Sequence, residues 1–300
     1  MIATLLAAFD LGRVLDVQPL GGTATKKWNV LTERGRFVVR RRPDEFADSV
    51  EFDHAVLRRL DAAGFPVPCP VGVLVRDDGA YEVLRWIEGE PFREGDIPEL
   101  GRFLAEFHKT LSRDFPAGKE GRLREDHPDL LASYTDSKEI EAQLNLVRRE
   151  LDERLYATLP RAIIHGDFHP GNIRFRAARV AALYDFDYTA VQARVRDVSD
   201  AVIFFASLRR QPLNPDDIRS LTQPFVPDVE RCRLLLAAYP LTPAEWEALP
   251  WLIRSRWIQM RLRGSRKVPP AEKTAFILDG FFEVINWLDK HGANFFQSLA

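Results

Sequence analysis

Side chains able to take up protons or bind metal ions are crowded into residues 165–172, which read His-Gly-Asp-Phe-His-Pro-Gly-Asn. The apolar triplet 162–164 before them predicts a short buried strand. A predicted hairpin over 173–184 follows and ends in the acidic stretch Asp185-Phe186-Asp187. Ionisable groups at the ends of buried strands cost free energy unless they have partners or a ligand. We therefore expect the chemistry of this protein to lie in this part of the chain.

The spacing of these residues is typical of phosphoryl transfer. Asp167 precedes Asn172 by five residues, as the catalytic aspartate precedes the metal-binding asparagine in the protein-kinase loop. Asp185 stands one hairpin later, where the aspartate of the kinase Asp-Phe-Gly motif would stand. Phosphoryl transfer needs groups that position the reactants and neutralise charge more than it needs covalent chemistry by the protein.

The rest of the sequence predicts a small β-rich part followed by a larger helical part. Five strands are expected at 14–20, 28–32, 36–40, 72–75 and 81–84, with one helix at 50–63. Later helices are expected at 98–111, 129–159, 197–209, 228–238, 243–263 and 271–291. The predicted fold class is therefore α+β, with a small lobe over 1–85, a larger lobe over 86–300 and any cleft near 84–89.

These stretches resemble the aminoglycoside phosphotransferase/choline kinase-like family. The loop 165–172 together with 185–187 is similar to that family's catalytic loop and metal motif. Residues 37–40 resemble the strand that bears the ATP-phosphate lysine, and 50–52 resemble the helix start that bears its glutamate partner. Residues 81–84 with 87–89 resemble the last strand and hinge of the small lobe, and 104–108 resemble the first large-lobe helix. The resemblance covers most of the chain. It implies a two-lobed protein-kinase-like fold, in which a small lobe holds an antiparallel sheet with one helix and a larger lobe is helical. It also implies that the protein phosphorylates a hydroxyl group of a small molecule.

The resemblance implies ATP and Mg²⁺ as cofactors and a role for each matched residue. Asp167 would accept or orient the proton of the attacking hydroxyl group. Asn172 and Asp185 would hold Mg²⁺, a hard cation that prefers oxygen ligands. Glu51 would fix Arg40 so that its guanidinium lies on the α- and β-phosphates of ATP.

Further nucleotide contacts are implied for two stretches of backbone. Gly21 and Gly22 would let the first loop come close to the phosphates. The hinge backbone from Arg85 to Ile87 would bind the edge of the adenine ring.

The chain departs from the family pattern in three places. Arg40 stands where the phosphate lysine would stand; arginine keeps the charge and can bind phosphate through two nitrogens, with a different geometry. The loop 21–25 is not G-x-G-x-x-G, and Lys26 or Lys27 would assist phosphate binding there. Asp187 replaces the glycine of Asp-Phe-Gly, where it would either bind a second Mg²⁺ or be hydrogen-bonded within the loop.

Two other classes of function use the same residues. His165, Asp167 and His169 alternate, so on an extended segment they would converge on one transition metal in a hydrolase. That interpretation leaves Arg40, Glu51 and Asn172 without a role. A nucleotide-binding pseudokinase that regulates a partner is supported by Arg40 alone. The presence of Asp167, Asn172 and Asp185 argues against it.

Charge gives an indication of the phosphate acceptor. Residues 201–300 carry 13 Lys and Arg against 10 Asp and Glu, and no acidic residue lies between 248 and 271. Like charge would oppose a polycationic aminoglycoside, so we expect an acceptor with a carboxylate or phosphate, or a neutral sugar. Arg254 and Arg261, on one helical face, would anchor it; the alternative is a solvated basic face. The stretch 239–245 also resembles homoserine kinases and N-acetylhexosamine kinases, which makes homoserine kinase-like or sugar kinase-like activity the alternative.

The composition narrows the partners and the setting. The 300 residues hold 42 Lys and Arg against 44 Asp and Glu, a net charge of -2. This balance predicts neither nucleic-acid nor membrane binding. Cys69 and Cys232 are too few for a disulfide framework, and no apolar run reaches the roughly 18 residues of a membrane span. We expect a cytoplasmic monomer or homodimer whose partner is a small hydroxyl-bearing molecule.

Overall fold

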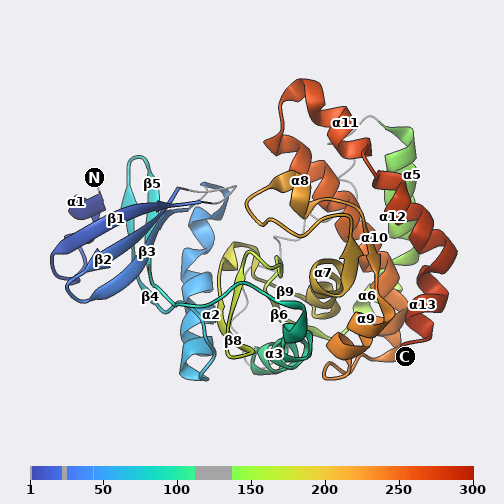
Figure 1. The fold of residues 1–300 in the computed structure, drawn as a ribbon, viewed down its shortest axis with the longest axis horizontal. Helices are drawn as coiled ribbons and strands as arrows, with labels where there is room; N and C mark the ends of the chain where they lie inside the picture. The colour runs from blue at the N-terminus through green and yellow to red at the C-terminus, as the bar shows by residue number, and fades with distance from the viewer. Residues whose placement is uncertain (1, 22–25, 43, 112–136) are drawn as a thin grey trace. The chain divides into compact units, whose positions relative to one another are not determined.

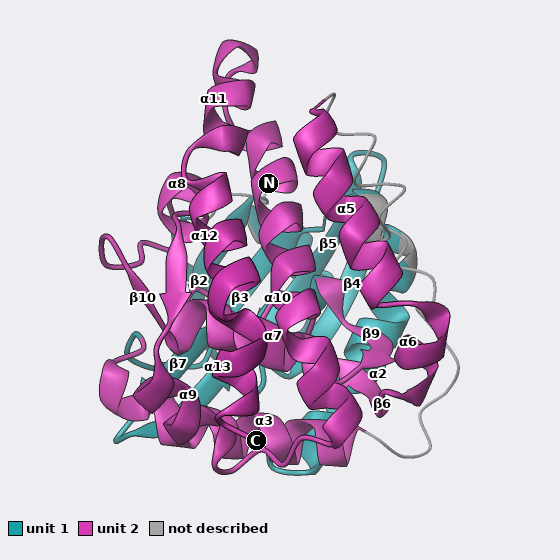
Figure 2. Cartoon of the chain, turned by 90° about the vertical axis from the view of Figure 1, so that its right-hand side faces the viewer, with its two compact units in different colours: residues 1–91, 173–187 teal, residues 92–172, 188–300 magenta. Residues whose placement is uncertain are grey.

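The computed structural model of the protein describes residues 2–21, 26–42, 44–111 and 137–300. The chain divides into two compact units, coloured separately in Figure 2. The first comprises Met1–Pro91 and Ile173–Asp187, and the second comprises Phe92–Asn172 and Tyr188–Ala300. Residues predicted to act in catalysis therefore belong to both units.

Within its described residues, the first unit contains a five-stranded antiparallel sheet in the order β1-β2-β3-β5-β4 (Figure 1). Its strands are β1 (Val14–Leu20), β2 (Lys27–Thr32), β3 (Gly35–Arg41), β4 (Pro70–Arg76) and β5 (Gly79–Arg85). Gly35 and Gly79 each begin the second strand of a hairpin with φ at 131°, a conformation that favours glycine. The five predicted strands and the predicted α+β class are confirmed.

The two faces of this sheet carry different chemistry because side chains alternate along each strand. Val39 and Val83 point to one face, where they pack with the short helix α1 (Ile2–Leu6) in an apolar core. Arg40 follows Val39 and Glu82 precedes Val83, so both point to the opposite face. That second face carries the charged groups of the candidate site.

Helix α2 (Val50–Ala62) provides the partner for the charged face. Its buried residues are Asp53, His54, Val56, Leu57 and Leu60. Three of them are apolar, as the predicted helical spacing requires, and two are ionisable. The helix ends before Gly64, whose φ of 81° lets the chain turn away.

A short hairpin from later in the chain completes the first unit. It consists of β7 (Ile173–Arg176) and β8 (Arg179–Leu183). Glu90 pairs with Phe175 in an isolated bridge, and the Leu183 amide donates to the Pro66 carbonyl over 2.9 Å. These backbone bonds explain why 173–187 clusters with the first unit, whereas the boundary predicted at 85/86 assigned it to the larger lobe.

The second unit is mainly helical. Its described helices of eight residues or more are α3 (Ile97–Thr110), α5 (Lys138–Glu150), α7 (Val195–Phe205), α9 (Val229–Leu236) and α10 (Pro243–Gly264). Shorter ones are α6 (Glu153–Thr158), α8 (Ile218–Leu221), α11 (Lys273–Leu278), α12 (Phe281–Trp287) and α13 (Ala293–Gln297). Two strand pairs, β6 (Arg161–Ile164) with β9 (Ala190–Ala193) and β10 (Ser207–Arg209) with β11 (Phe225–Pro227), accompany them.

Helix α10 is the centre of this unit and contacts α5, α7, α12 and α13 (Figure 1). Its start is fixed locally: Thr242 caps it, Pro243 occupies the first position, and Glu245 closes a capping box. Because α10 has neighbours on several sides, its arginines Arg254, Arg256 and Arg261 are buried rather than solvated.

Some predicted helices are divided in the structure. The segment 271–291 forms α11 and α12, separated at Gly280, whose φ is 66° and where an added Cβ would lie 2.1 Å from Cγ of Pro224. The segment 129–159 forms α5 and α6 over its described part, and 129–136 lies outside the described residues. No helix among the described residues combines the length and the apolar composition needed to cross a membrane.

Candidate active site

In the first unit, the buried guanidinium of Arg40 joins three carboxylates. Nε lies 2.5 Å from Glu82, Nη1 lies 3.1 Å from Asp185, and Nη2 lies 2.8 Å from Asp187. Only 4% of Arg40 is exposed. Burial alone would lower the pKa of Arg40, but Glu82, Asp187 and Asp185 outweigh it and raise that pKa well above its usual value. Arg40 is therefore a permanent cation beside the predicted metal ligands.

Two of these carboxylates, Asp185 and Asp187, form the acidic side of this cluster. Asp185 has a φ of 63°, which is strained for a residue other than glycine. Its Oδ2 accepts a hydrogen bond from Nζ of Lys27 over 3.1 Å. Burial raises the pKa of Asp187 to about 6 against the opposing effect of Arg40, and the neighbouring Asp185 adds to the rise.

This acidic pair fits a divalent cation. A bound cation would favour the ionised form of Asp187 and would relieve its repulsion with Asp185. Mg²⁺ is usually bound in proteins by one or two carboxylates together with substrate phosphates. The donor set that the first unit offers is therefore suitable for Mg²⁺.

The strand-to-helix ion pair of the first unit differs from the predicted one. Arg40 has Glu82 as its close partner, whereas Glu51 is exposed on the first turn of α2. Glu51 and Asp53 project about 200° apart around the helix, and Asp53 is the residue that faces the sheet. It binds Arg42 over 2.5 Å, with both side chains buried. The predicted Glu51–Arg40 pair is wrong.

Glu82 and His54 were not predicted from sequence. His54 Nε2 lies 2.6 Å from Glu82 Oε1. Burial would raise the pKa of Glu82, but Arg40, His54 and Arg42 lower it far below its usual value. The signal that could have identified Glu82 is a lone acidic residue on β5, a strand paired on both sides, at the register position opposite Arg40.

The other predicted nucleotide contacts of the first unit are backbone groups. Gly21 lies just after β1 and is exposed, and Gly22 lies outside the described residues. At the hinge, the Arg85 amide donates to the Cys69 carbonyl over 3.0 Å, and the Ile87 carbonyl accepts a hydrogen bond from the Tyr184 hydroxyl. Their role in binding adenine stays a prediction.

In the second unit, the loop after β6 presents Asp167 with three polar neighbours. Arg256 Nη2 donates to Oδ1 over 2.9 Å. His169 Nε2 lies 3.4 Å from Oδ2, and Asn172 Nδ2 donates to the Asp167 carbonyl over 3.0 Å. Burial would raise the pKa of Asp167, but His169, Arg256 and His165 hold it far below its usual value. The structure thus places Asn172 against Asp167, whose carboxylate is ionised.

The tautomer of His169 follows from the same loop. Its Nδ1 accepts a hydrogen bond from the Gly171 amide over 3.0 Å. The hydrogen of a neutral ring then lies on Nε2, which faces Asp167. His169 therefore acts as a donor to Asp167.

Asp197, on the first turn of α7, anchors this loop. It accepts hydrogen bonds from the amides of His165 and Gly166 over 2.7 and 2.8 Å. His108 Nε2 lies 3.1 Å from Asp197, and its Nδ1 lies 2.7 Å from the Tyr239 hydroxyl. These contacts explain how a glycine-containing loop keeps one shape.

Arg256 is the arginine of α10 that serves Asp167, and sequence reasoning missed it. Its Nε donates to Asp200 over 2.7 Å and its Nη1 to Gln259 over 2.6 Å. Asp200 in turn accepts a hydrogen bond from the Phe168 amide over 3.3 Å. The basic run of α10 was visible in the sequence, but its charge alone did not distinguish the arginine that faces the loop.

The predicted acceptor anchors Arg254 and Arg261 take other roles. Arg261 is 2% exposed, donates to the carbonyls of Thr222 and Ile277, and stacks on Phe276. Among the described residues its hydrogen bonds go to Thr222 and Ile277, and none goes to the loop that carries Asp167, so the prediction for Arg261 is wrong. The i, i+7 spacing did place both arginines on one stripe, but α10 turns that stripe inward.

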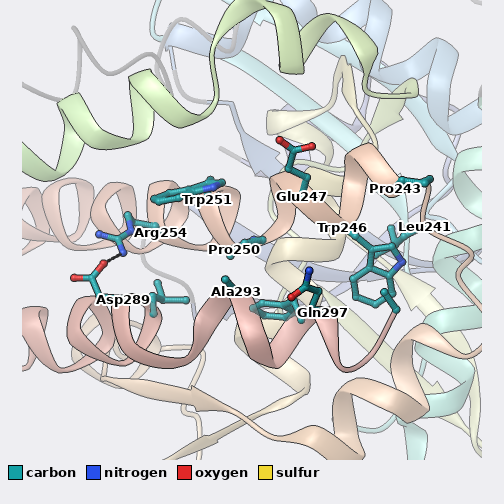
Figure 3. A pocket seen from close by; sticks show the side chains of 13 residues that line it. Leu241, Pro243, Trp246, Glu247, Pro250, Trp251, Arg254, Asp289, Ala293 and Gln297 are labelled. Carbon is teal, nitrogen blue, oxygen red and sulfur yellow. Dashed lines mark hydrogen bonds and ion pairs between the residues drawn. The ribbon is translucent and has the colours of Figure 1, made fainter.

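Arg254 lines a pocket of about 830 Å³ between the start of α10 and the C-terminal helices (Figure 3). It binds Asp289 and Gln143, and it is 2% exposed. Trp251, Pro250 and Trp246 line the same pocket. Arg254 and Arg256 project about 200° apart around the helix, so this pocket lies away from the face of α10 that holds Asp167, and an anchoring role for Arg254 beside that loop is not supported.

The fold and the two charged clusters define a protein-kinase-like phosphotransferase. A choline kinase from Streptococcus pneumoniae superposes with a TM-score of 0.66 at 14% identity, covering 97% of this chain and 98% of that chain. A spectinomycin phosphotransferase, solved with ADP and spectinomycin, superposes with a TM-score of 0.60 at 13% identity, covering 99% and 97%. Residues 16–235 match the phosphotransferase enzyme family, and the chain belongs to that family.

The sequence is also similar to enzymes named homoserine kinase. The enzyme of that name from Acidiphilium cryptum is 28% identical over 285 residues, which cover 87% of this chain and 84% of the relative. The predicted family, kinase-like fold and enzyme class are confirmed: the protein is a phosphotransferase that acts on a hydroxyl group of a small molecule.

Proposed function

We propose that this enzyme transfers the γ-phosphoryl group of ATP to the hydroxyl group of homoserine or of a closely similar amino acid. The observation that carries the proposal is the likeness to enzymes named homoserine kinase, which extends over most of the chain, beyond residues 16–235 of the family match. The ADP bound to the spectinomycin phosphotransferase supports an adenine nucleotide as the donor.

Asp167 is the proposed catalytic residue. Because His169 and Arg256 keep it ionised, its carboxylate can accept a hydrogen bond from the acceptor hydroxyl. The hydroxyl oxygen forms a bond to the γ-phosphorus while the bond from that phosphorus to the bridging oxygen of ADP breaks. The hydroxyl proton passes to Asp167 and then to solvent, and ADP leaves with the electron pair of the broken bond.

The first unit supplies the proposed charge neutralisation. Arg40 and Lys27 both contact Asp185, and they are proposed to bind the phosphates of ATP. Asp185, with Asp187 beside it, is proposed to hold Mg²⁺, which when bound neutralises negative charge on the phosphates. A role for Asn172 as a further ligand stays a prediction.

The proposal is tested first on the nucleotide and then on the acceptor. Calorimetry should show ATP binding that strengthens with Mg²⁺ in the wild type and loses that gain in Asp185→Asn. A coupled assay of ADP release should then show activity with homoserine, less activity with a neutral sugar or an aminoglycoside, and a loss of at least about 100-fold in kcat for Asp167→Ala. Absence of ATP binding would contradict the kinase proposal, whereas ATP binding with turnover of a sugar alone would contradict the acceptor.

A further inference from the structure

Arg40 and Glu82 are direct partners across the β3–β5 ladder. Opposite residues of an antiparallel pair have their Cβ atoms about 4.5–5.5 Å apart on the same face, so Glu82 reaches Arg40 within the sheet. Its Oε2 lies 2.5 Å from Nε of Arg40, and the two terminal nitrogens then meet Asp185 and Asp187 at 3.1 and 2.8 Å. Glu82 therefore holds Nε of the Arg40 guanidinium and directs its two terminal nitrogens to Asp185 and Asp187.

His54 holds Glu82 from the side of α2. Its Nε2 lies 2.6 Å from Oε1, and neither side chain is more than 6% exposed. Arg42 Nη1 lies 3.5 Å from each oxygen of Glu82. Both carboxylate oxygens thus have close partners, which removes the freedom of Glu82 to rotate away from Arg40.

We infer that Glu82 is the positioning residue that orients Arg40 for binding the phosphates of ATP, and that His54 orients Glu82 in turn. This inference rests on the proposed function. It gives a strand residue the role that was predicted for Glu51 of the helix. Helix α2 then acts on the phosphate site through His54, while the buried pair of Arg42 and Asp53 ties it to the residue that follows β3.

The first test compares Glu82→Gln with Glu51→Gln. Glutamine keeps the size and one acceptor oxygen of Glu82 but removes the charge that fixes the guanidinium. Since a hydrogen bond to a charged group is strong, we expect Glu82→Gln to raise the KM for ATP and the calorimetric Kd of MgATP at least about ten-fold. The KM for the acceptor should stay unchanged, and Glu51→Gln should leave both nucleotide constants within about two-fold of wild type. The inference is overturned if Glu82→Gln leaves the KM for ATP and the Kd of MgATP near the wild-type values while Glu51→Gln raises them.

A second pair of variants tests His54 and serves even if Glu82→Gln does not fold. His54→Gln places an amide donor near the position of Nε2, whereas His54→Leu has no donor. We expect the KM for ATP to stay near the wild-type value in His54→Gln and to rise about ten-fold in His54→Leu. A merely structural role would lower the folded fraction, and hence the apparent kcat, without changing that KM. Equal KM values in the two variants overturn the role of His54.

Failure of the proposed function gives a different result. If the wild type binds no MgATP, the kinase proposal itself fails. If the wild type binds MgATP and turns over homoserine while Glu82→Gln keeps wild-type affinity for MgATP, only the positioning role of Glu82 fails.

Discussion

Arg256 joins the α10 helix to two carboxylates: Asp200, which is fully buried, and Asp167, whose side chain is 27% exposed. It donates to Asp167 over 2.9 Å and to Asp200 over 2.7 Å, and it is 7% exposed. Breaking a buried ion pair on one side costs more than the pair itself contributes. Replacing Arg256 by Met should therefore lower the free energy of unfolding by about 3–5 kcal/mol and lower kcat, because Asp167 loses its orientation.

Urea unfolding checks this expectation, with Arg219→Met as the matched control. Arg219 pairs with Glu272, and both side chains are about half exposed. Exposed pairs contribute roughly 0–1 kcal/mol, so the control should change stability by no more than that. An Arg256→Met protein as stable as the control would mean that Asp167 and Asp200 find other partners.

Some single residues could be predicted from the sequence and others could not. Asp167 and Asn172 were identifiable because the spacing of a short loop survives folding unchanged. The partner of Arg40 was not identifiable, because Glu82 meets it through strand register, which links residues 42 positions apart. Arg256 was hidden for a similar reason: a run of arginines gives the charge of a helix but not the face on which each of them lies.

Helices α3 and α9 pack closely enough that one glycine decides their separation. A Cβ added to Gly101 of α3 would lie 2.0 Å from the Leu235 carbonyl oxygen of α9. Alanine is a better helix former than glycine by about 1 kcal/mol, so propensity alone predicts that Gly101→Ala stabilises the protein. We expect the opposite sign, a loss of roughly 1–3 kcal/mol, because inserting a methyl group into a packed contact forces the helices apart.

The control for this element is Gly95→Ala, because an added Cβ there meets no atom within 4 Å. Thermal unfolding should show a lower Tm for Gly101→Ala and a Tm within about 2 °C of wild type for Gly95→Ala. A Tm increase in Gly101→Ala would show that α9 moves at little cost and that propensity dominates.

The elements themselves were largely predictable, and their interruptions less so. The five strands and α2 follow from periodicity and hairpin glycines, which act locally. The division of 271–291 at Gly280 depends on Pro224, whose ring lies where any larger side chain would go. The position of the 173–187 hairpin likewise depends on backbone bonds to Glu90 and Pro66, which no local pattern indicates.

Across the whole molecule, each unit buries an ionised carboxylate that holds its part of the candidate site. Glu82 does so in the first unit and Asp197 in the second. Burial would raise the pKa of both groups, but Arg40 and His54 lower the pKa of Glu82, and His108 and His165 lower that of Asp197. The polar interior of both units is therefore stable only while these groups remain ionised.

Acid should consequently destabilise the protein in a defined pH window. In the unfolded chain Glu and Asp titrate near pH 4.3 and 3.9, above their depressed values in the folded state. The unfolded chain therefore binds more protons at low pH, so the stability from Glu82 and Asp197 is fully present above about pH 5 and is lost as the pH falls below about 4. Each group can add up to about 1.4 kcal/mol per pH unit to the slope.

Urea unfolding at pH 5, 4 and 3 measures this slope in the wild type, Glu82→Gln and Asp197→Asn. Both variants should be less stable at pH 5, because each loses buried charged contacts. Their stability should also fall less steeply with acid, since each lacks one titrating group. If both variants keep the wild-type slope, other carboxylates govern the acid response. A shallower slope in both would show that the groups that hold the two parts of the site also set the acid limit of the whole protein.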